Sequence, residues 1–118
     1  MKEFMLFIKS EGNPLENLSL EQQQEHVKKV GAYITRLVEE GRMKAAQPLE
    51  MEGNIVSYRN GQFIDGPFNE TKEVISGYYH LMATDLNDAV QLAKQDPRFK
   101  DGDWTIEIRP VMKVDGIN

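Results

Sequence analysis

The chain has 118 residues, of which 40% are apolar and 28% charged, with a net charge of −5 and a pI near 5.0. This length and composition fit one globular domain over residues 1–118 with a single modest core. The acidic balance argues against a nucleic-acid partner, and the absence of cysteine excludes disulfides, thiolate metal sites and a cysteine nucleophile. No stretch has the character of a signal peptide or a membrane span, so we expect a cytoplasmic protein with no membrane partner.

The first third of the chain predicts a strand followed by a long helix. Residues Phe4–Ile8 form a continuous apolar run, which is typical of a central strand that is buried on both faces. Ser19 with Gln22 three positions later has the form of a capping box, and Gly41 supplies a C-terminal stop. Between them, apolar residues at helical spacing predict one buried stripe: Val27, Val30, Ile34, Leu37 and Val38.

The middle of the chain predicts a hairpin. Residues 43–51 are irregular, and Pro48 argues against a central strand there. Residues 54–58 are predicted to be the second strand. The turn at Arg59–Gln62 contains Asn-Gly, which suits a type I′ turn, and a short return arm runs from Phe63 to Asp65.

The last third predicts a strand, a helix and a final strand. Residues 74–83 separate by parity into an apolar side and a more polar side, the latter with Ser76, Tyr78, His80 and Met82. Asp85 caps a helix that ends at Asp96-Pro97, and residues 104–111 alternate as a strand. The order of elements predicts an α+β, ferredoxin-like βαββαβ fold with a four-stranded antiparallel sheet.

Two helices can cover only one face of such a sheet. The other face would carry Tyr78, Met82 and a central apolar strand, which is a large apolar surface to leave in water. An isologous contact with a second copy would bury it, so we expect a homodimer. The mixed face formed by His80, Tyr78, Glu107 and Arg109 would then line a ligand cleft at or near the interface.

A signature follows the predicted hairpin. Asp65 precedes Gly66-Pro67, where glycine tolerates special backbone angles and proline fixes φ, so this carboxylate would be held still in a turn. The run Asp65-Gly-Pro-Phe-x-Glu-x-Lys-Glu, leading into Gly77-Tyr-Tyr, resembles the signature of the YCII-related family in its DGPF branch. The resemblance covers most of the chain, from Met1 to about Val111. It implies a dimeric α+β barrel.

Three residues are candidates for chemistry. In the broader YCII-related family a histidine and an aspartate form the proposed active pair, which the resemblance transfers to His26 and Asp65. Asp65 is interpreted either as a general base or histidine-orienting anion, or as a turn acid that only accepts backbone hydrogen bonds. His26 and His80 are interpreted as proton carriers, or as a packing residue and a tolerated polar residue of a wet cleft.

Further residues are candidates for ligand binding. Glu70 and Lys72 match the family signature and would line the mouth of the pocket, or form ordinary surface ion pairs. Glu107 and Arg109 match the family's Glu-x-Arg-Pro-Val ending. Their spacing of two places them on one face of a strand, as an anion site or as an intra-sheet ion pair. By parity, Tyr78 rather than Tyr79 would enter the pocket.

Two functions remain open from the sequence. No nucleotide-binding loop, nucleophile elbow or zinc motif is present, so we expect no cofactor and no metal. The first hypothesis is a homodimer that binds an unknown small molecule and, if catalytic, performs acid–base chemistry of the lyase or isomerase type, with Arg109 as anion anchor. The second is a non-catalytic ligand- or protein-binding module, because DGPF domains of this family are associated with sigma-factor-type regulators.

Overall fold

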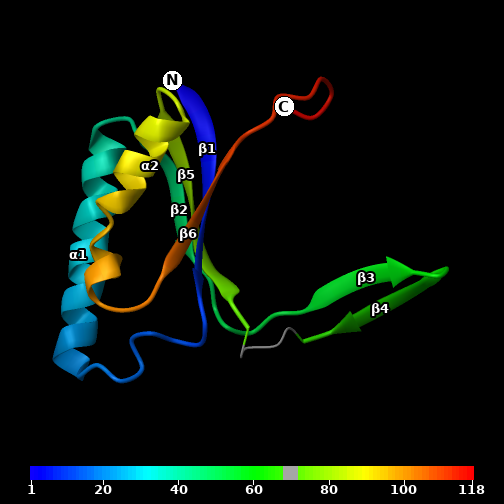
Figure 1. Cartoon of the computed structure of the whole chain (residues 1–118), viewed down its shortest axis with the longest axis horizontal. Helices are drawn as coiled ribbons and strands as arrows, with labels where there is room; N and C mark the ends of the chain where they lie inside the picture. Colours follow the sequence, from blue (N-terminus) through cyan, green and yellow to red (C-terminus); the bar gives the residue numbers. More distant parts are fainter. Residues whose placement is uncertain (68–71) are drawn as a thin grey trace.

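The computed structural model describes residues 1–67 and 72–118. They form a four-stranded antiparallel sheet, two α-helices, a 3₁₀ helix and a separate hairpin (Figure 1). In chain order the elements are β1 (Lys2–Ser10), α1 (Leu20–Glu39), β2 (Met43–Pro48), β3 (Ile55–Arg59), β4 (Gln62–Gly66), β5 (Val74–Ala83), α2 (Leu86–Lys94), η1 (Pro97–Lys100) and β6 (Thr105–Pro110). The strand order β2-β5-β1-β6, with both helices on one side, is compatible with the predicted ferredoxin-like fold.

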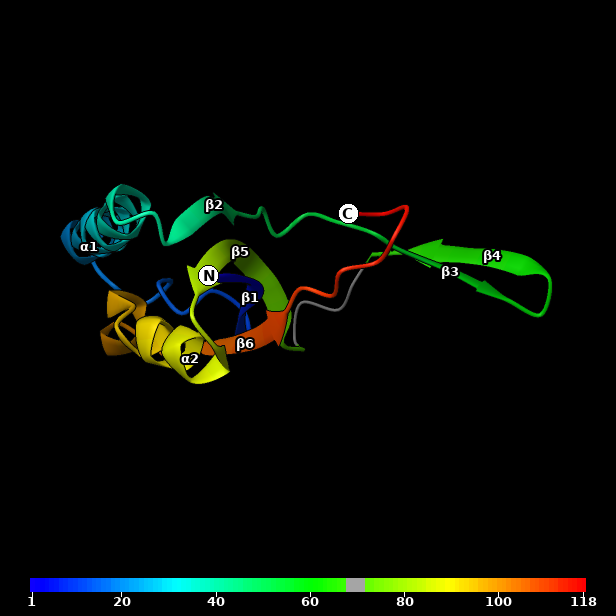
Figure 2. The same cartoon turned by 90° about the horizontal axis from the view of Figure 1, so that it is seen from above.

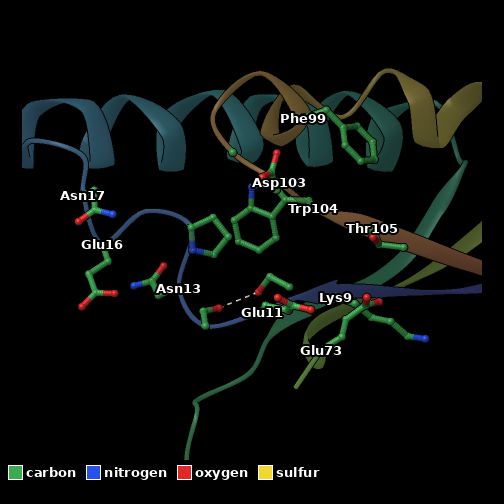
Figure 3. A pocket seen from close by; sticks show the side chains of 14 residues that line it. Lys9, Glu11, Asn13, Glu16, Asn17, Glu73, Phe99, Asp103, Trp104 and Thr105 are labelled. Atoms are coloured by element: carbon green, nitrogen blue, oxygen red, sulfur yellow. Dashed lines mark hydrogen bonds between the residues drawn. The ribbon is translucent and has the colours of Figure 1, made fainter. Parts of the chain in front are cut away.

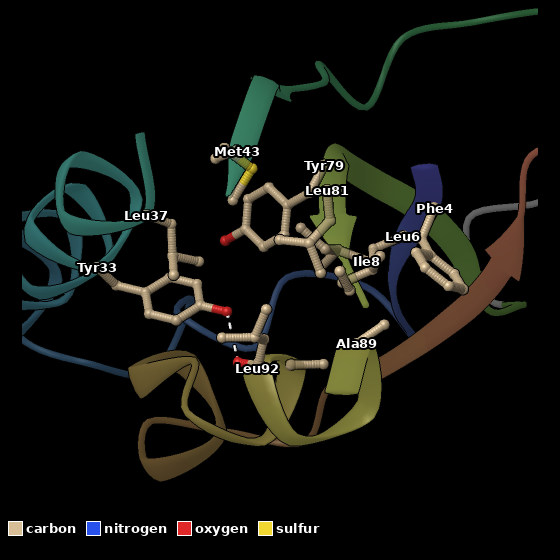
Figure 4. Packing of buried hydrophobic residues seen from close by; sticks show 12 residues of the cluster. Phe4, Leu6, Ile8, Tyr33, Leu37, Met43, Tyr79, Leu81, Ala89 and Leu92 are labelled. Carbon is tan, nitrogen blue, oxygen red and sulfur yellow. Dashed lines mark hydrogen bonds between the residues drawn. The ribbon is translucent and has the colours of Figure 1, made fainter. Parts of the chain in front are cut away.

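The core lies between the sheet and the two helices. Alternate residues of the central strand β1 point to the helices and are almost fully buried, namely Phe4, Leu6 and Ile8. Figure 4 shows them beside Leu81 of β5, in one cluster that extends to Leu37 of α1. The other side of β1 is only half-buried in the single chain, so the prediction of a strand buried on both faces is met on the helix face alone.

Helix α1 begins and ends as its sequence predicts. The Ser19 hydroxyl accepts from the backbone N–H of Gln22, whose side chain accepts from the N–H of Ser19, so the capping box is complete. At the other end Gly41 has a φ of 72°, and the N–H of Arg42 donates to the carbonyl of Leu37 over 2.8 Å, which closes a Schellman motif.

The buried stripe of α1 was predicted correctly only in part: Leu37 is buried and Ile34 packs against the core, as expected. The buried residues are His26, Tyr33 and Leu37, whereas Val27 is 66% exposed and Val38 52% exposed. The stripe is rotated because Tyr33 reaches across the core, where its hydroxyl donates to the carbonyl of Leu92 in α2 over 2.7 Å. Tyr33, whose hydroxyl has a buried hydrogen-bond partner, therefore faces the core, whereas Val27 and Val38 of the predicted stripe face outward.

The second strand of the sheet is β2 and not residues 54–58. Pro48 does not prevent this, because β2 is an edge strand and Pro48 is its last residue, opposite Gly77. The predicted strand at 54–58 is instead β3, which pairs only with β4. The hairpin is therefore an addition to the four-stranded sheet.

The β3–β4 hairpin has the predicted turn and projects from the body of the protein (Figures 1 and 2). Asn60 has a φ of 51° and Gly61 a φ of 77°, as a type I′ turn requires. Its large apolar side chains are at least half exposed, and they are Ile55, Val56, Tyr58, Phe63 and Ile64.

The sheet face away from the helices carries the mixed set that parity predicts. Tyr78 and Glu107 lie opposite Phe7 on the two neighbouring strands, and His80 and Arg109 lie opposite Met5. This side of the sheet, with Met82, is called the open face below. No helix in the described ranges, 1–67 and 72–118, is long and apolar enough to cross a membrane.

Candidate functional site

Asp65 lies on the projecting hairpin. Asp65 is an exposed residue of β4, opposite Val56. The turn that follows is held by the N–H of Gly66, which donates to the Asn54 side chain over 2.8 Å. Among the described residues, no hydrogen bond joins Asp65 to His26 or His80. A catalytic role for Asp65 thus stays a prediction.

His80 lies on the open face and is engaged by another acid. Its Nε2 is 2.8 Å from Glu3, which also accepts from Lys44 over 3.1 Å and from Lys113 over 2.6 Å. Hydrogen bonds from Lys113 and Lys44 lower the pKa of Glu3 to about 2. Glu3, Lys44, His80 and Lys113 thus form a cluster of ion pairs at one end of the open face. This cluster lies on the other side of the sheet from His26.

The predicted ligand-binding residues are dispersed. Glu107 is paired with Lys9 at 2.5 Å, and the Arg109 side chain is 70% exposed and 3.9 Å from Glu107, which is the intra-sheet ion-pair arrangement. Tyr78 is half-buried nearby, and Lys72 is exposed beyond the hairpin. Glu70 falls outside the described residues.

His26 has a carboxylate partner that the sequence analysis did not identify. Its Nδ1 is 2.7 Å from Oδ2 of Asp101, and its side chain is only 6% exposed. Lys29, one turn further along α1, donates to the other oxygen of Asp101 over 3.1 Å. Asp101 is placed by η1, since its own N–H donates to the carbonyl of Arg98 over 2.9 Å.

The protonation of this pair follows from its contacts. Hydrogen bonds from His26 and Lys29 hold the pKa of Asp101 below its ordinary value, so the group is an ionised carboxylate and can only accept. The His26 Nδ1 must therefore carry the hydrogen. In a neutral imidazole Nε2 is then unprotonated and able to accept a proton.

A second network lies beside the first. Asp96, whose side chain is fully buried, caps η1 by accepting from the N–H of Arg98 over 3.0 Å, and Pro97 suits the first position of that helix. The Asp96 carboxylate also accepts from the Arg98 Nε and from the Tyr79 hydroxyl, both over 2.9 Å. The rings of His26 and Trp104 stack with centroids 6.1 Å apart, and the Arg98 guanidinium lies 5.2 Å from the Trp104 ring.

Four of these side chains line one cavity of about 360 Å³. His26, Tyr79, Arg98 and Trp104 form its polar and aromatic part. The rest of its wall is mostly apolar and comes from α1, β2 and the ends of β1 and β5, including Val27, Val30, Ile34, Ala46 and Pro48. A largely apolar cavity of this size with a few convergent polar groups is the usual form of a small-molecule site.

A larger hollow of about 800 Å³ also has Trp104 in its wall (Figure 3). Figure 3 shows it lined by Glu11, Asn13, Glu16 and Asn17 of the loop after β1, facing Asp103 and Trp104. It is strongly polar and contains neither histidine. We place the candidate site in the smaller cavity, because there a base, its orienting acid and an apolar wall coincide.

The sequence analysis expected Tyr78 in the pocket, whereas Tyr79 of β5 lines the cavity. The other functional residues that the sequence analysis missed lie in one short region between α2 and β6. Asp96-Pro97 was interpreted only as a helix stop, and Trp104 only as part of an alternating strand. These residues could have been noticed because charged and aromatic side chains are concentrated in the loop between two predicted elements. They are Asp96, Arg98, Asp101 and Trp104, the last being the only tryptophan of the chain.

The fold and site define a small ferredoxin-like α+β domain with a histidine–carboxylate pair at an apolar cavity. The family model of the YCII-related domain matches residues 3–115. The chain therefore belongs to the YCII-related family. A search of curated proteins gave no match. In the part of the chain that the structure describes, no three side chains of metal-binding type are grouped to hold a metal ion.

Proposed function

We propose that the chain is a cofactor-free acid–base enzyme of the lyase or isomerase type, from the DGPF branch of its family, acting as a cytoplasmic homodimer. The observation that carries the proposal is the His26–Asp101 pair at the apolar cavity. Nε2 of His26 would take a proton from a carbon of the bound molecule, while ionised Asp101 stabilises the resulting imidazolium. Lys29 keeps Asp101 ionised.

The proton then has two possible destinations. Returned to a different carbon, it completes an isomerisation. If a leaving group departs from the adjacent carbon instead, the electron pair of the broken C–H bond forms a double bond, the proton on Nε2 passes to the leaving group, and the reaction is an elimination. The half-buried cavity wall of Val30 and Ile34 would exclude water from the carbanion-like intermediate, which lowers the local dielectric and strengthens the interaction with the imidazolium.

The homodimer is supported by two apolar surfaces, the half-buried open face and the exposed hairpin. The open face carries Met5, Phe7, Tyr78 and Met82 on one sheet with no helix over them. The hairpin adds side chains such as Phe63, 78% exposed, and a two-stranded hairpin is marginally stable alone. Packing the open faces around a two-fold axis would form the α+β barrel and bury the hairpins against the partner.

Catalysis can be tested without knowing the substrate. Small carbonyl compounds and unsaturated acids incubated with the protein in D₂O would gain deuterium at acidic carbon positions, which mass spectrometry detects. We expect exchange with the wild type, its loss in His26→Gln, and a marked decrease in Asp101→Asn. The matched control is His80→Gln, which removes the chain's other histidine from the opposite side of the sheet and should leave exchange intact.

A binding module is the alternative that remains. The exposed position of Asp65 and the apolar hairpin favour it, because both suit contact with another protein rather than chemistry within one chain. Ligands that enter the His26 cavity but exchange no deuterium at any pH would support a regulatory role and overturn the enzymatic one.

A further inference from the structure

Arg98 is a permanent cation in the wall of a cavity that is otherwise mostly apolar. Its side chain is 11% exposed, and its guanidinium lies 5.7 Å from the Tyr79 ring centroid and 5.2 Å from that of Trp104. Burying part of a charge is costly unless partners satisfy it. The contacts of the individual guanidinium nitrogens therefore indicate what else this side chain can bind.

Two of the guanidinium nitrogens are occupied by the protein. Nε donates to Asp96, and Nη2 donates to the Tyr79 hydroxyl over 2.8 Å. Arginine has five N–H donors. Among the described residues, no acceptor is hydrogen-bonded to Nη1, which leaves one side of the fork for an external acceptor.

The same contacts fix the orientation of the fork. Asp96 holds Nε, Tyr79 holds Nη2, and the Trp104 ring lies against the plane, so little side-chain freedom remains to be lost on binding. The other cation near the site, Lys29, is already paired with Asp101. Arg98 is thus the cation best placed to receive an anionic ligand.

We infer that Arg98 binds the carboxylate of a small, largely apolar acid whose carbon skeleton lies beside His26. A planar carboxylate matches the geometry of a guanidinium edge. The hydrocarbon part of the acid fits the wall formed by Val30, Ile34 and Ala46. This inference rests on the proposed function in that it uses the same cavity, and it replaces the exposed Arg109 as the anion anchor.

The experiment compares benzoate with benzamide, and hexanoate with hexanamide, by titration followed in the ¹H–¹⁵N spectrum of the wild-type protein, including the Trp104 indole. Each pair has nearly the same shape and differs in charge. We expect the carboxylate of at least one pair to bind about tenfold or more tightly than its amide, as one charge-assisted contact allows. Equal affinity within both pairs, or no binding of any of the four, would overturn the inference.

Variants identify the residue responsible. Arg98→Gln should abolish the preference for carboxylate, whereas Arg36→Gln, the same change at a surface position of α1, should keep it. If Arg98→Gln unfolds, the comparison in the wild-type protein still decides. A carboxylate preference that survives in a folded Arg98→Gln protein would contradict the assignment.

This outcome is separable from that of the proposed function. His26→Gln should still prefer carboxylates, because the anchor does not use the imidazole. Deuterium exchange that depends on His26 but shows no carboxylate preference would refute the anchor alone. A carboxylate preference without exchange would refute the catalysis alone.

Discussion

Removing one buried hydroxyl tests the network that fixes Arg98. Tyr79 is 2% exposed, and its hydroxyl donates to Asp96 over 2.9 Å and accepts from Arg98 over 2.8 Å. Tyr79→Phe removes both contacts with charged groups without opening a large cavity. Hydrogen bonds to charged groups contribute about 1.5–3 kcal/mol, so we expect the free energy of unfolding to fall by about 2–3 kcal/mol.

Tyr33→Phe is the matched control. Tyr33 is similarly buried at 5% exposure, but its hydroxyl makes one neutral hydrogen bond, to the carbonyl of Leu92. Its loss should cost about 1 kcal/mol. Both variants are measured by urea unfolding with the m-value checked for constancy. A Tyr79→Phe cost no larger than that of Tyr33→Phe would refute the claim that the hydroxyl supports the Asp96–Arg98 pair.

The same two residues predict an alkaline transition. Burial raises the pKa of both Tyr33 and Tyr79 above the ordinary value of 10.0. A group whose pKa is raised in the folded state contributes stability that is complete below its unfolded pKa and is lost as pH rises above it. The urea midpoint should therefore fall above pH 10, and it should fall less in the double phenylalanine variant.

The remaining predictions concern the ends of the sheet, the helix and the hairpin. Because the pKa of Glu3 is lowered from 4.5 to about 2, its stabilising contribution is present above pH 4.5 and is lost as pH falls toward 2. The urea midpoints of the wild type and Glu3→Gln should therefore converge over that range. A difference that stays constant would contradict this prediction. Gly41→Ala should lower the free energy of unfolding by about 1 kcal/mol, because the φ of Gly41 is 72°. Gly31→Ala lies inside α1, where no neighbouring group lies within 4 Å of the added carbon, and should raise it by up to about 1 kcal/mol. Thermal melts that shift in the same direction for both variants would be inconsistent with these backbone conformations. Phe63→Ser should weaken the proposed dimer while leaving the monomer folded, as sedimentation at several concentrations would show, and an unchanged association constant would remove the hairpin from the interface.

Much of the fold could be predicted because its signals are local. The capping box of Ser19, the left-handed Gly41 and the Asn60-Gly61 turn each depend on a few adjacent residues. The parity of β5 was also predictable, since one strand specifies which side chains share a face. The assignment of β2 failed because a proline is compatible with an edge strand, and edge or centre is decided by the whole sheet.

The site was predictable only in part. His26 could be named from the sequence, but its partner lies 75 positions away at the end of a 3₁₀ helix, and the signature turn suggested a different acid. The Arg98 fork depends on Tyr79 of β5 meeting Asp96 and Trp104 of the connection between α2 and β6. Such convergence is a property of the packed chain, so no spacing rule reports it.

The central claim is that His26 works through an unprotonated Nε2, and long-range ¹H–¹⁵N correlation of its imidazole measures this most directly. At a pH where the ring is neutral, we expect the hydrogen on Nδ1, held there by Asp101, with Nε2 showing the shift of a free lone pair. In Asp101→Asn this preference should weaken. A hydrogen found on Nε2 in the wild-type protein would contradict the proposed base.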